Sequence, residues 1–181
     1  VVTRLGEGVD ARRRLLPVPV ARVRNVLTDF RRELEALGAE YTLAVATSAV
    51  RDAENGEAFL GEVEWSYGFD TRLLSGDEEA ELTRRGAGLD GAKALLLDVG
   101  GGSTELSTDA FRVSLDVGSI RLTERFFGAD PPKPEEIDAA DAYVLSHLPE
   151  LDVEEAIGVA GTVHQLADLA QHETITAAEV E

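Results

Sequence analysis

The stretch LLLDVGGGSTEL, residues 95–106, combines residue types that together could bind a phosphate group. An apolar run leads into Asp98, and three consecutive glycines, Gly100, Gly101 and Gly102, follow almost at once. A strand that ends at Asp98 would place this carboxylate at the carboxyl edge of a sheet, where α/β proteins bind ligands. Because glycines have no side chain, several main-chain N–H groups can turn toward one point, and such nests of amides bind phosphate.

Ser103 and Thr104 follow the glycines and add hydroxyl donors to this predicted loop. Asp98 would repel a phosphate, so the motif indicates a hard divalent cation between the two. Mg²⁺ is the natural candidate, since it uses one or two carboxylates and bridges to phosphate oxygens. The alternative is a glycine-rich hairpin turn with a capping aspartate and no ligand. Composition alone leaves both interpretations open.

A second acidic motif, LSGDEEAEL at residues 74–82, supplies a candidate general base. Ser75 stands three residues before Glu78, which is the spacing of a capping box and gives Glu78 a structural role at a helix start. No capping role is predicted for Glu79, which would lie in the first turn of the same helix and could face a cleft. A carboxylate placed there would be suited to activate a water molecule. The alternative is a solvated acidic helix face.

Three basic or hydroxyl side chains elsewhere could contact phosphate oxygens. Arg51 comes just after a predicted strand, and arginine offers a planar fork of donors that suits phosphate. The alternative for Arg51 is a surface ion pair with one of the many acids. Ser119 and Arg121 lie in SLDVGSIRLTERF, residues 114–126, which repeats the DVG string of the glycine-rich stretch. They could reach a second phosphate, or they could simply begin a helix.

The hydrophobic pattern predicts strands that alternate with helices, which indicates the α/β class. Trp65 is expected on a helix and partly packed on the core. A boundary near residues 87–93 would divide the chain into two α/β lobes, 1–90 and 91–181. Helices are expected at 20–37, 59–67, 77–87, 119–127, 134–148 and 162–171, and strands at 41–47, 70–75, 94–100 and 155–161, with two more inside 104–118.

The composition limits the classes of function. The 181 residues include 35 acidic and 17 basic residues, and the formal net charge is −18. Such a surface argues against nucleic acid or an anionic membrane as partner, and a polyanionic substrate would need a metal or a local basic pocket. The absence of cysteine excludes disulfides, thiol catalysis and thiolate metal sites. No apolar run approaches the roughly 20 residues that span a bilayer.

Taken together, these stretches resemble the exopolyphosphatase/guanosine pentaphosphate phosphatase (Ppx/GppA) family. The resemblance covers most of the chain and is most specific in the pair GGGSTE and SGxEEA. It rests on segments that occur in the family's order: TRLGEGVD, ATSAVRDAEN, LSGDEEAEL, LLLDVGGGSTEL, SLDVGSIRLTERF and GVAGTV.

The resemblance implies an actin-like fold (the Hsp70/sugar-kinase, ribonuclease H-like fold) with two α/β lobes and a cleft between them. It also implies Mg²⁺-dependent removal of the terminal phosphate of inorganic polyphosphate, or of the 5′-phosphate of guanosine pentaphosphate, by a cytoplasmic homodimer. The catalytic glutamate of the family falls on Glu79, and Arg51 matches an arginine at the mouth of the cleft. Its metal-linked aspartate falls on Asp98, with Glu105 as a further acidic residue beside it. The phosphate-binding loop matches residues 100–104.

One departure from the family pattern affects the first lobe. The family begins with an apolar strand and a first phosphate loop resembling D-x-G-T-N-S, whereas this chain begins with VVTRLGEGVD. We therefore expect an incomplete N-terminal lobe and a C-terminally truncated second lobe. Two alternatives to the hydrolase stay open: a catalytically inactive module that binds phosphate or an alarmone and acts by regulation, and an ATPase or kinase of the same fold.

Overall fold

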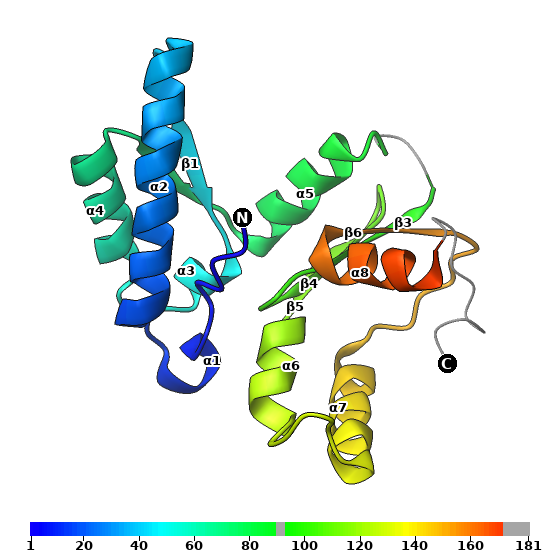
Figure 1. Cartoon of the computed structure of the whole chain (residues 1–181). Coiled ribbons are helices and arrows are strands. Elements are labelled where there is room, and N and C mark those ends of the chain that lie inside the picture. The colour runs from blue at the N-terminus through cyan, green and yellow to red at the C-terminus, as the bar shows by residue number, and fades with distance from the viewer. Residues whose placement is uncertain (90–92, 172–181) are drawn as a thin grey trace. The chain divides into compact units, whose positions relative to one another are not determined.

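Helices and strands alternate along the chain, which confirms the predicted α/β class (Figure 1). The computed structural model describes residues 1–89 and 93–171. The chain divides into two units, unit 1 at Val1–Gly76 and unit 2 at Asp77–Glu181. The predicted boundary between residues 90 and 91 lies outside the described residues. The observed division comes earlier, because the helix that follows Ser75 contacts the sheet of unit 2.

Unit 1 is built on two parallel strands, β1 (Leu43–Ala46) and β2 (Asp70–Leu73). The helices α1 (Val9–Arg12) and α2 (Pro17–Leu37) precede them, and α3 (Ser48–Arg51) and α4 (Gly56–Tyr67) connect them. Proline at the first position favours the start of α2, and Gly38 in the left-handed conformation ends it. The four-residue helices α1 and α3 were not predicted, because they are too short to show a hydrophobic period.

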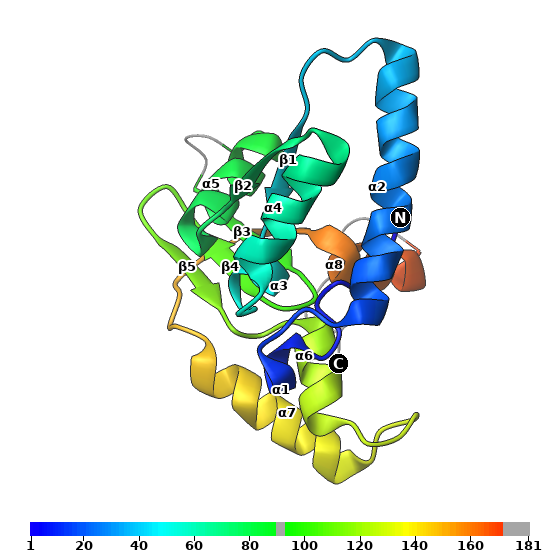
Figure 2. The same cartoon turned by 90° about the vertical axis from the view of Figure 1, so that its left-hand side faces the viewer.

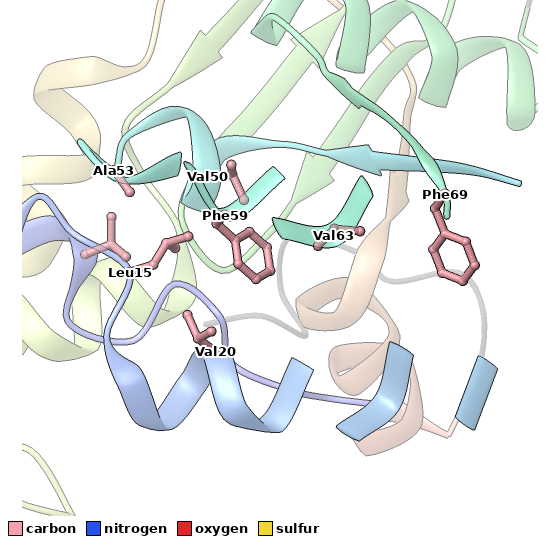
Figure 3. Close-up of a cluster of buried hydrophobic side chains, with 8 residues drawn as sticks. Leu15, Val20, Val50, Ala53, Phe59, Val63 and Phe69 are labelled. Carbon is pink, nitrogen blue, oxygen red and sulfur yellow. The ribbon is translucent and has the colours of Figure 1, made fainter. Parts of the chain in front are cut away.

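The core of unit 1 lies where α2, α3 and α4 meet the two strands. Figure 3 shows side chains of α2, α3 and α4 pointing toward one another, with Phe59 of α4 among them. An ion pair at the edge adds a second link between α2 and α4, since Arg24 donates to both carboxylate oxygens of Glu62 at 2.6 Å. The buried residues of this cluster are Val9, Leu15, Val20, Val50, Ala53, Phe59, Val63 and Phe69.

The predicted packing of Trp65 on the core is wrong. Trp65 lies on α4 as predicted, but 89% of its surface is exposed, whereas Phe59 on the same helix is only 8% exposed. Trp65 is about 120° from Phe59 and about 160° from Val63 around the axis of an α-helix. Phe59 and Val63 take the side that faces the core, so Trp65 is left outside.

Replacing Phe59 with alanine should lower the free energy of unfolding by about 3–5 kcal/mol, because it removes a buried aromatic side chain and leaves a cavity. The matched control is Trp65→Ala on the same helix, which should change stability by no more than about 0.5 kcal/mol. Denaturant unfolding followed by circular dichroism measures both. Equal losses in the two variants would contradict the packing of α4 described above.

Unit 2 contains a four-stranded mixed sheet in the order β5-β4-β3-β6. The central strand β3 (Leu95–Val99) pairs antiparallel with β4 (Thr104–Ser107) and parallel with β6 (Ala156–Val159), and β4 pairs antiparallel with β5 (Arg112–Leu115). The helices are α5 (Gly76–Gly86), α6 (Ser119–Phe126), α7 (Pro134–His147) and α8 (Ala160–Ala170). Ser75 immediately precedes α5, which is the position that the capping-box pattern assigns to it.

The two faces of this sheet differ in chemistry. On one face Leu95, Leu106 and Leu115 form an apolar cluster with residues of α6 and α7, and Figure 2 shows α7 passing the lower end of α6 at an angle. The alternation of strand residues places Asp98 and Glu105 on the opposite face. One face therefore builds the core of unit 2, and the other is available for polar chemistry. In the described part of the chain, no helix is both long and apolar enough to cross a membrane.

Candidate active site

The glycine-rich stretch is a hairpin turn between β3 and β4, closed by a hydrogen bond from the Gly100 amide to the Ser103 carbonyl at 3.0 Å. The carbonyls of Gly100 and Gly101 accept hydrogen bonds of 2.9–3.1 Å from the first three amides of α6. The carbonyl of Gly102 accepts one from Arg121 Nε at 2.7 Å. All three glycine carbonyls of the turn therefore face α6.

This arrangement determines where the amides of the turn point. In a planar trans peptide the N–H points opposite to the C=O, so the amides of Gly101, Gly102 and Ser103 point away from α6. Within the described residues 1–89 and 93–171, no hydrogen bond joins these three amides to another main-chain group. Main-chain amides that point outward in this way can donate to an anion. The stretch is thus a hairpin turn, as the ligand-free interpretation required, and it also offers the donors that a phosphate site needs.

Gly118 allows α6 to approach this turn closely. A Cβ at position 118 would lie 2.5 Å from the carbonyl oxygen of Gly101 and 2.6 Å from the carbonyl carbon of Gly102. Any side chain there would push the turn away from α6, and the hydrogen bonds that orient its carbonyls would be lost. The DVG string at 116–118 therefore has a structural purpose in the site.

Replacing Gly118 with alanine should destabilise the protein by about 1–3 kcal/mol, the usual cost of overpacking, and should weaken phosphate binding because the turn is displaced. Gly161→Ala in α8 is the control, since a Cβ there meets nothing within 4 Å. That variant should gain up to about 1 kcal/mol from better helix propensity. Thermal unfolding and titration with inorganic phosphate measure the two effects. Unchanged stability and phosphate affinity in Gly118→Ala would show that the turn does not depend on this contact.

A row of polar residues crosses the sheet next to the turn. Asp98 on β3 is directly opposite Glu105 on β4, which in turn is opposite Ser114 on β5. Glu105 is only 2% exposed, and the Ser114 hydroxyl donates to its Oε1 at 2.7 Å. Like charges on directly opposed strand residues are destabilising. A pair of carboxylates held this way is therefore typical of a site that binds a cation or carries out chemistry.

Burial raises the pKa of Glu105 above the usual carboxyl range, and the charges of Glu79 and Asp98 raise it further. Hydrogen bonds from the Ser114 and Ser103 hydroxyls act in the opposite direction and offset part of the shift. Burial also raises the pKa of Asp98, and a hydrogen bond from the Thr83 hydroxyl offsets part of it. Both carboxylates would be more stable with a cation between them than without one.

The raised pKa of Glu105 predicts how stability depends on pH. The native protein holds this proton more tightly than the unfolded chain, so stability should fall as pH rises from the ordinary carboxyl range through the raised pKa. Glu105→Gln should remove this contribution and flatten the decline. Melting temperatures measured across this pH range, with chelator present, test the prediction.

Glu136→Gln is a control of opposite sign. Main-chain hydrogen bonds from Lys133 and Gly128 lower the pKa of Glu136. Its contribution is therefore present above the ordinary carboxyl pKa and lost as pH falls, and this variant should lose stability at neutral pH only. An identical pH profile for the wild type and Glu105→Gln would contradict the described environment of Glu105.

Helix α5 brings Glu79 to the same face of the sheet. Glu79 and Thr83 are four residues apart, and the Thr83 hydroxyl reaches both the Glu79 carbonyl, at 2.9 Å, and the Asp98 carboxylate. The charge of Glu79 raises the pKa of Glu105, so the two carboxylates lie within electrostatic range of each other. Unit 2 by itself therefore holds Asp98 and Glu105 opposite each other next to the turn, with Glu79 on the helix whose Thr83 reaches Asp98.

The other predicted phosphate contacts have internal partners in the structure. The Thr104 hydroxyl donates to the Val117 carbonyl at 2.7 Å, and that of Ser103 to Glu105. The Ser119 hydroxyl lies 3.4 Å from the Gly100 carbonyl. Arg121, which is 7% exposed, also approaches Asp116 at 3.5 Å in addition to its bond to the turn. These side chains support the turn, and their predicted contact with phosphate stays a prediction.

Arg51 lies in unit 1, at the end of α3, and its Nη1 donates to the Leu74 carbonyl at 2.7 Å. Its predicted role in catalysis stays a prediction. The structure adds three residues that the sequence-based prediction did not include: Thr83, Ser114 and Gly118. The position of Thr83 one helical turn after Glu79, and the repeated DVG before Ser119, were the available signals. Ser114 had none, because its role depends on strand register.

The two carboxylates suit Mg²⁺, which accepts hard oxygen ligands and uses one or two carboxylates alongside water and phosphate oxygens. Burial disfavours the charged form of both carboxylates and so raises their pKa values, and a bound cation would stabilise that charged form. Among the described residues, no group of three or more His, Cys, Asp or Glu side chains is placed to hold a metal ion. An ion held by Asp98 and Glu105 would thus take its remaining ligands from water and substrate.

Comparison with known proteins places these features in context. Residues 1–180 match the model of the Ppx/GppA phosphatase family. Exopolyphosphatase 2 of Mycobacterium tuberculosis is 39% identical over 193 residues, covering 96% of this chain and 60% of that protein. Guanosine-5′-triphosphate,3′-diphosphate pyrophosphatase of Photobacterium profundum is 30% identical over 183 residues, covering 92% of this chain and 36% of that protein.

A crystal structure of an exopolyphosphatase-like protein superimposes with a TM-score of 0.85 at 33% identity, covering 94% of this chain and 61% of that one. The agreement confirms the actin-like α/β fold that the sequence motifs imply. The chain spans about three fifths of the length of that structure and of the M. tuberculosis relative.

Proposed function

Because the chain belongs to the Ppx/GppA phosphatase family, we propose that its protein hydrolyses the terminal phosphate of inorganic polyphosphate, the 5′-phosphate of guanosine pentaphosphate, or both. The observation that supports the proposal is that Asp98 lies opposite Glu105 next to a turn whose amides at 101–103 point away from α6, while the charge of Glu79 acts on Glu105. The names of the relatives, an exopolyphosphatase and a guanosine-5′-triphosphate,3′-diphosphate pyrophosphatase, support these two substrate classes.

In the proposed reaction the terminal phosphoryl group binds at the amides of the turn. Glu79 orients a water molecule in line with the bond to the leaving oxygen and accepts its proton as the new P–O bond forms. The bridging P–O bond then breaks, which releases inorganic phosphate and a chain shortened by one phosphate. Mg²⁺ held by Asp98 and Glu105 would supply charge neutralisation at the phosphoryl oxygens.

The charge distribution supports a site that depends on local neutralisation. Ten of the 17 basic residues but only 12 of the 35 acidic residues precede Asp77, so unit 1 carries a formal charge of −2 and unit 2 one of −16. The field of unit 2 opposes the approach of a polyanion. Amide donors and a divalent cation are therefore needed next to the carboxylates, and a catalytic role for Arg51 stays a prediction.

Replacing Glu79 with glutamine should lower the rate of phosphate release by roughly 10²–10⁴-fold, the usual contribution of a general base, while polyphosphate binding is retained. Asp77→Asn is the matched control, because it removes one negative charge from the same helical turn at an exposed position. That variant should keep near-normal activity. Phosphate release and polyphosphate binding are measured on the protein that carries this chain, with Mg²⁺ and with chelator.

The same assay separates the alternatives. Release from polyphosphate or guanosine pentaphosphate without ATP turnover supports the proposal, whereas ATP-dependent transfer would favour a kinase or ATPase. Retained ligand affinity with no turnover of either substrate would favour a regulatory binding module. Full activity of Glu79→Gln would exclude the proposed role of this residue.

A further inference from the structure

Helix α5, which carries Glu79, has an almost completely buried guanidinium on the side that faces the sheet. Arg84 is 2% exposed, and it lies five residues after Glu79. Burying a charged group is costly unless it is paired and hydrogen-bonded. The burial of Arg84 therefore calls for a structural or functional reason, because this side chain has no direct part in the proposed reaction.

Arg84 joins α5 to three separate parts of the sheet of unit 2. Its Nη1 donates to the Ala94 carbonyl just before β3, at 3.0 Å, and to the Ser107 carbonyl at the end of β4, at 3.1 Å. Its Nε donates to Asp109 Oδ1 at 3.1 Å, and its Nη2 lies 3.0 Å from the same oxygen. Asp109 belongs to the turn between β4 and β5 and is half exposed.

Apolar packing does little to fix this helix. Among the residues of α5, the buried ones are Ala80 and Arg84, and alanine offers a single methyl group. A methyl group allows a helix to slide or rotate at small cost. A planar fork of donors bonded to the Ala94 carbonyl just before β3 and to the Ser107 carbonyl on β4 allows one orientation. The position of α5 on the sheet therefore depends on the guanidinium more than on the hydrophobic effect.

The same face of the helix carries the groups of the candidate site. Glu79 and Thr83 are four residues apart, as are Ala80 and Arg84, so each pair lies along one line of the helix, and the two lines are about 100° apart around its axis. Rotation of α5 would separate Thr83 from Asp98 and Glu79 from Glu105 together. The Arg84 contacts and the geometry of the site are thus linked through a rigid element.

We propose that Arg84 is a positioning residue for Glu79: its fork to Ala94, Ser107 and Asp109 sets the orientation of α5, and so the place of the Glu79 carboxylate relative to Asp98 and Glu105. The inference rests on the proposed function, because Glu79 needs a defined position only if it directs a water molecule. A displacement of about 1 Å at a reacting group costs up to roughly 100-fold in rate.

The test compares Arg84→Lys with Arg85→Lys, in the protein that carries this chain. Lysine at position 84 keeps the positive charge but lacks the fork, so kcat for phosphate release should fall roughly 10- to 100-fold while KM changes less than about twofold. Arg85 is the exposed neighbour on the same helix, and its replacement should leave both constants unchanged. Asp109→Ala removes one arm of the fork and should give a smaller loss of kcat, again at constant KM.

Hydrogen exchange of the α5 amides provides the second readout. It distinguishes a positioning role of Arg84 from a purely structural one. The proposal expects faster exchange over residues 79–86 in Arg84→Lys, with the rest of unit 2 protected as in the wild type. Faster exchange together with unchanged kcat would reduce Arg84 to a structural residue and overturn the proposal. A wild type that turns over neither substrate would instead overturn the proposed function, and this inference with it.

Discussion

The candidate site depends on one constraint, the fixed orientation of the peptide groups in the turn between β3 and β4. Three carbonyls of this turn are held by the start of α6 and by Arg121, so three amides must point the other way. The same contacts use up the donors at the N-terminus of α6, which is otherwise a favourable place for an anion. The phosphate site proposed here is therefore formed by the turn, and α6 acts as its support.

The carboxylates beside the turn, by contrast, are placed where they lower the stability of the protein. Asp98 and Glu105 face each other across two strands, and the charge of Glu79 acts on Glu105 as well. Such an arrangement lowers stability, since each group would be better solvated on the surface. Hydroxyl donors of Ser103, Ser114 and Thr83 reduce the cost without removing it. A divalent cation held by Asp98 and Glu105 would offset the negative charge that the protein alone leaves uncompensated, and it could then also neutralise the oxygens of a phosphoryl group.

The placement of α5 connects these two features to the division of the chain. The helix begins at Gly76, where unit 1 ends, yet its Arg84 and Thr83 contact the sheet of unit 2. The sequence-based boundary at 90/91 assigned this helix to the first lobe because a glycine-rich segment follows it. Glycines mark where a chain can bend, but side-chain contacts decide to which unit a helix belongs. The contact of α5 with the sheet is made by a buried arginine. Hydrophobic periodicity counts arginine as a surface residue, so the sequence pattern did not predict this contact.

The sequence by itself determined the class of the fold, the order of its longer helices and its strands, and the two motifs proposed to carry the chemistry, because these depend on local periodicity and on residue types at short spacing. Glu79, Asp98 and the glycines were identified in this way. Only the tertiary structure decided that Glu105 is opposite Asp98, that Ser114 donates to it and that Gly118 makes room for the turn. Strand register and close approach of backbones join residues far apart in the chain, and no local pattern records them.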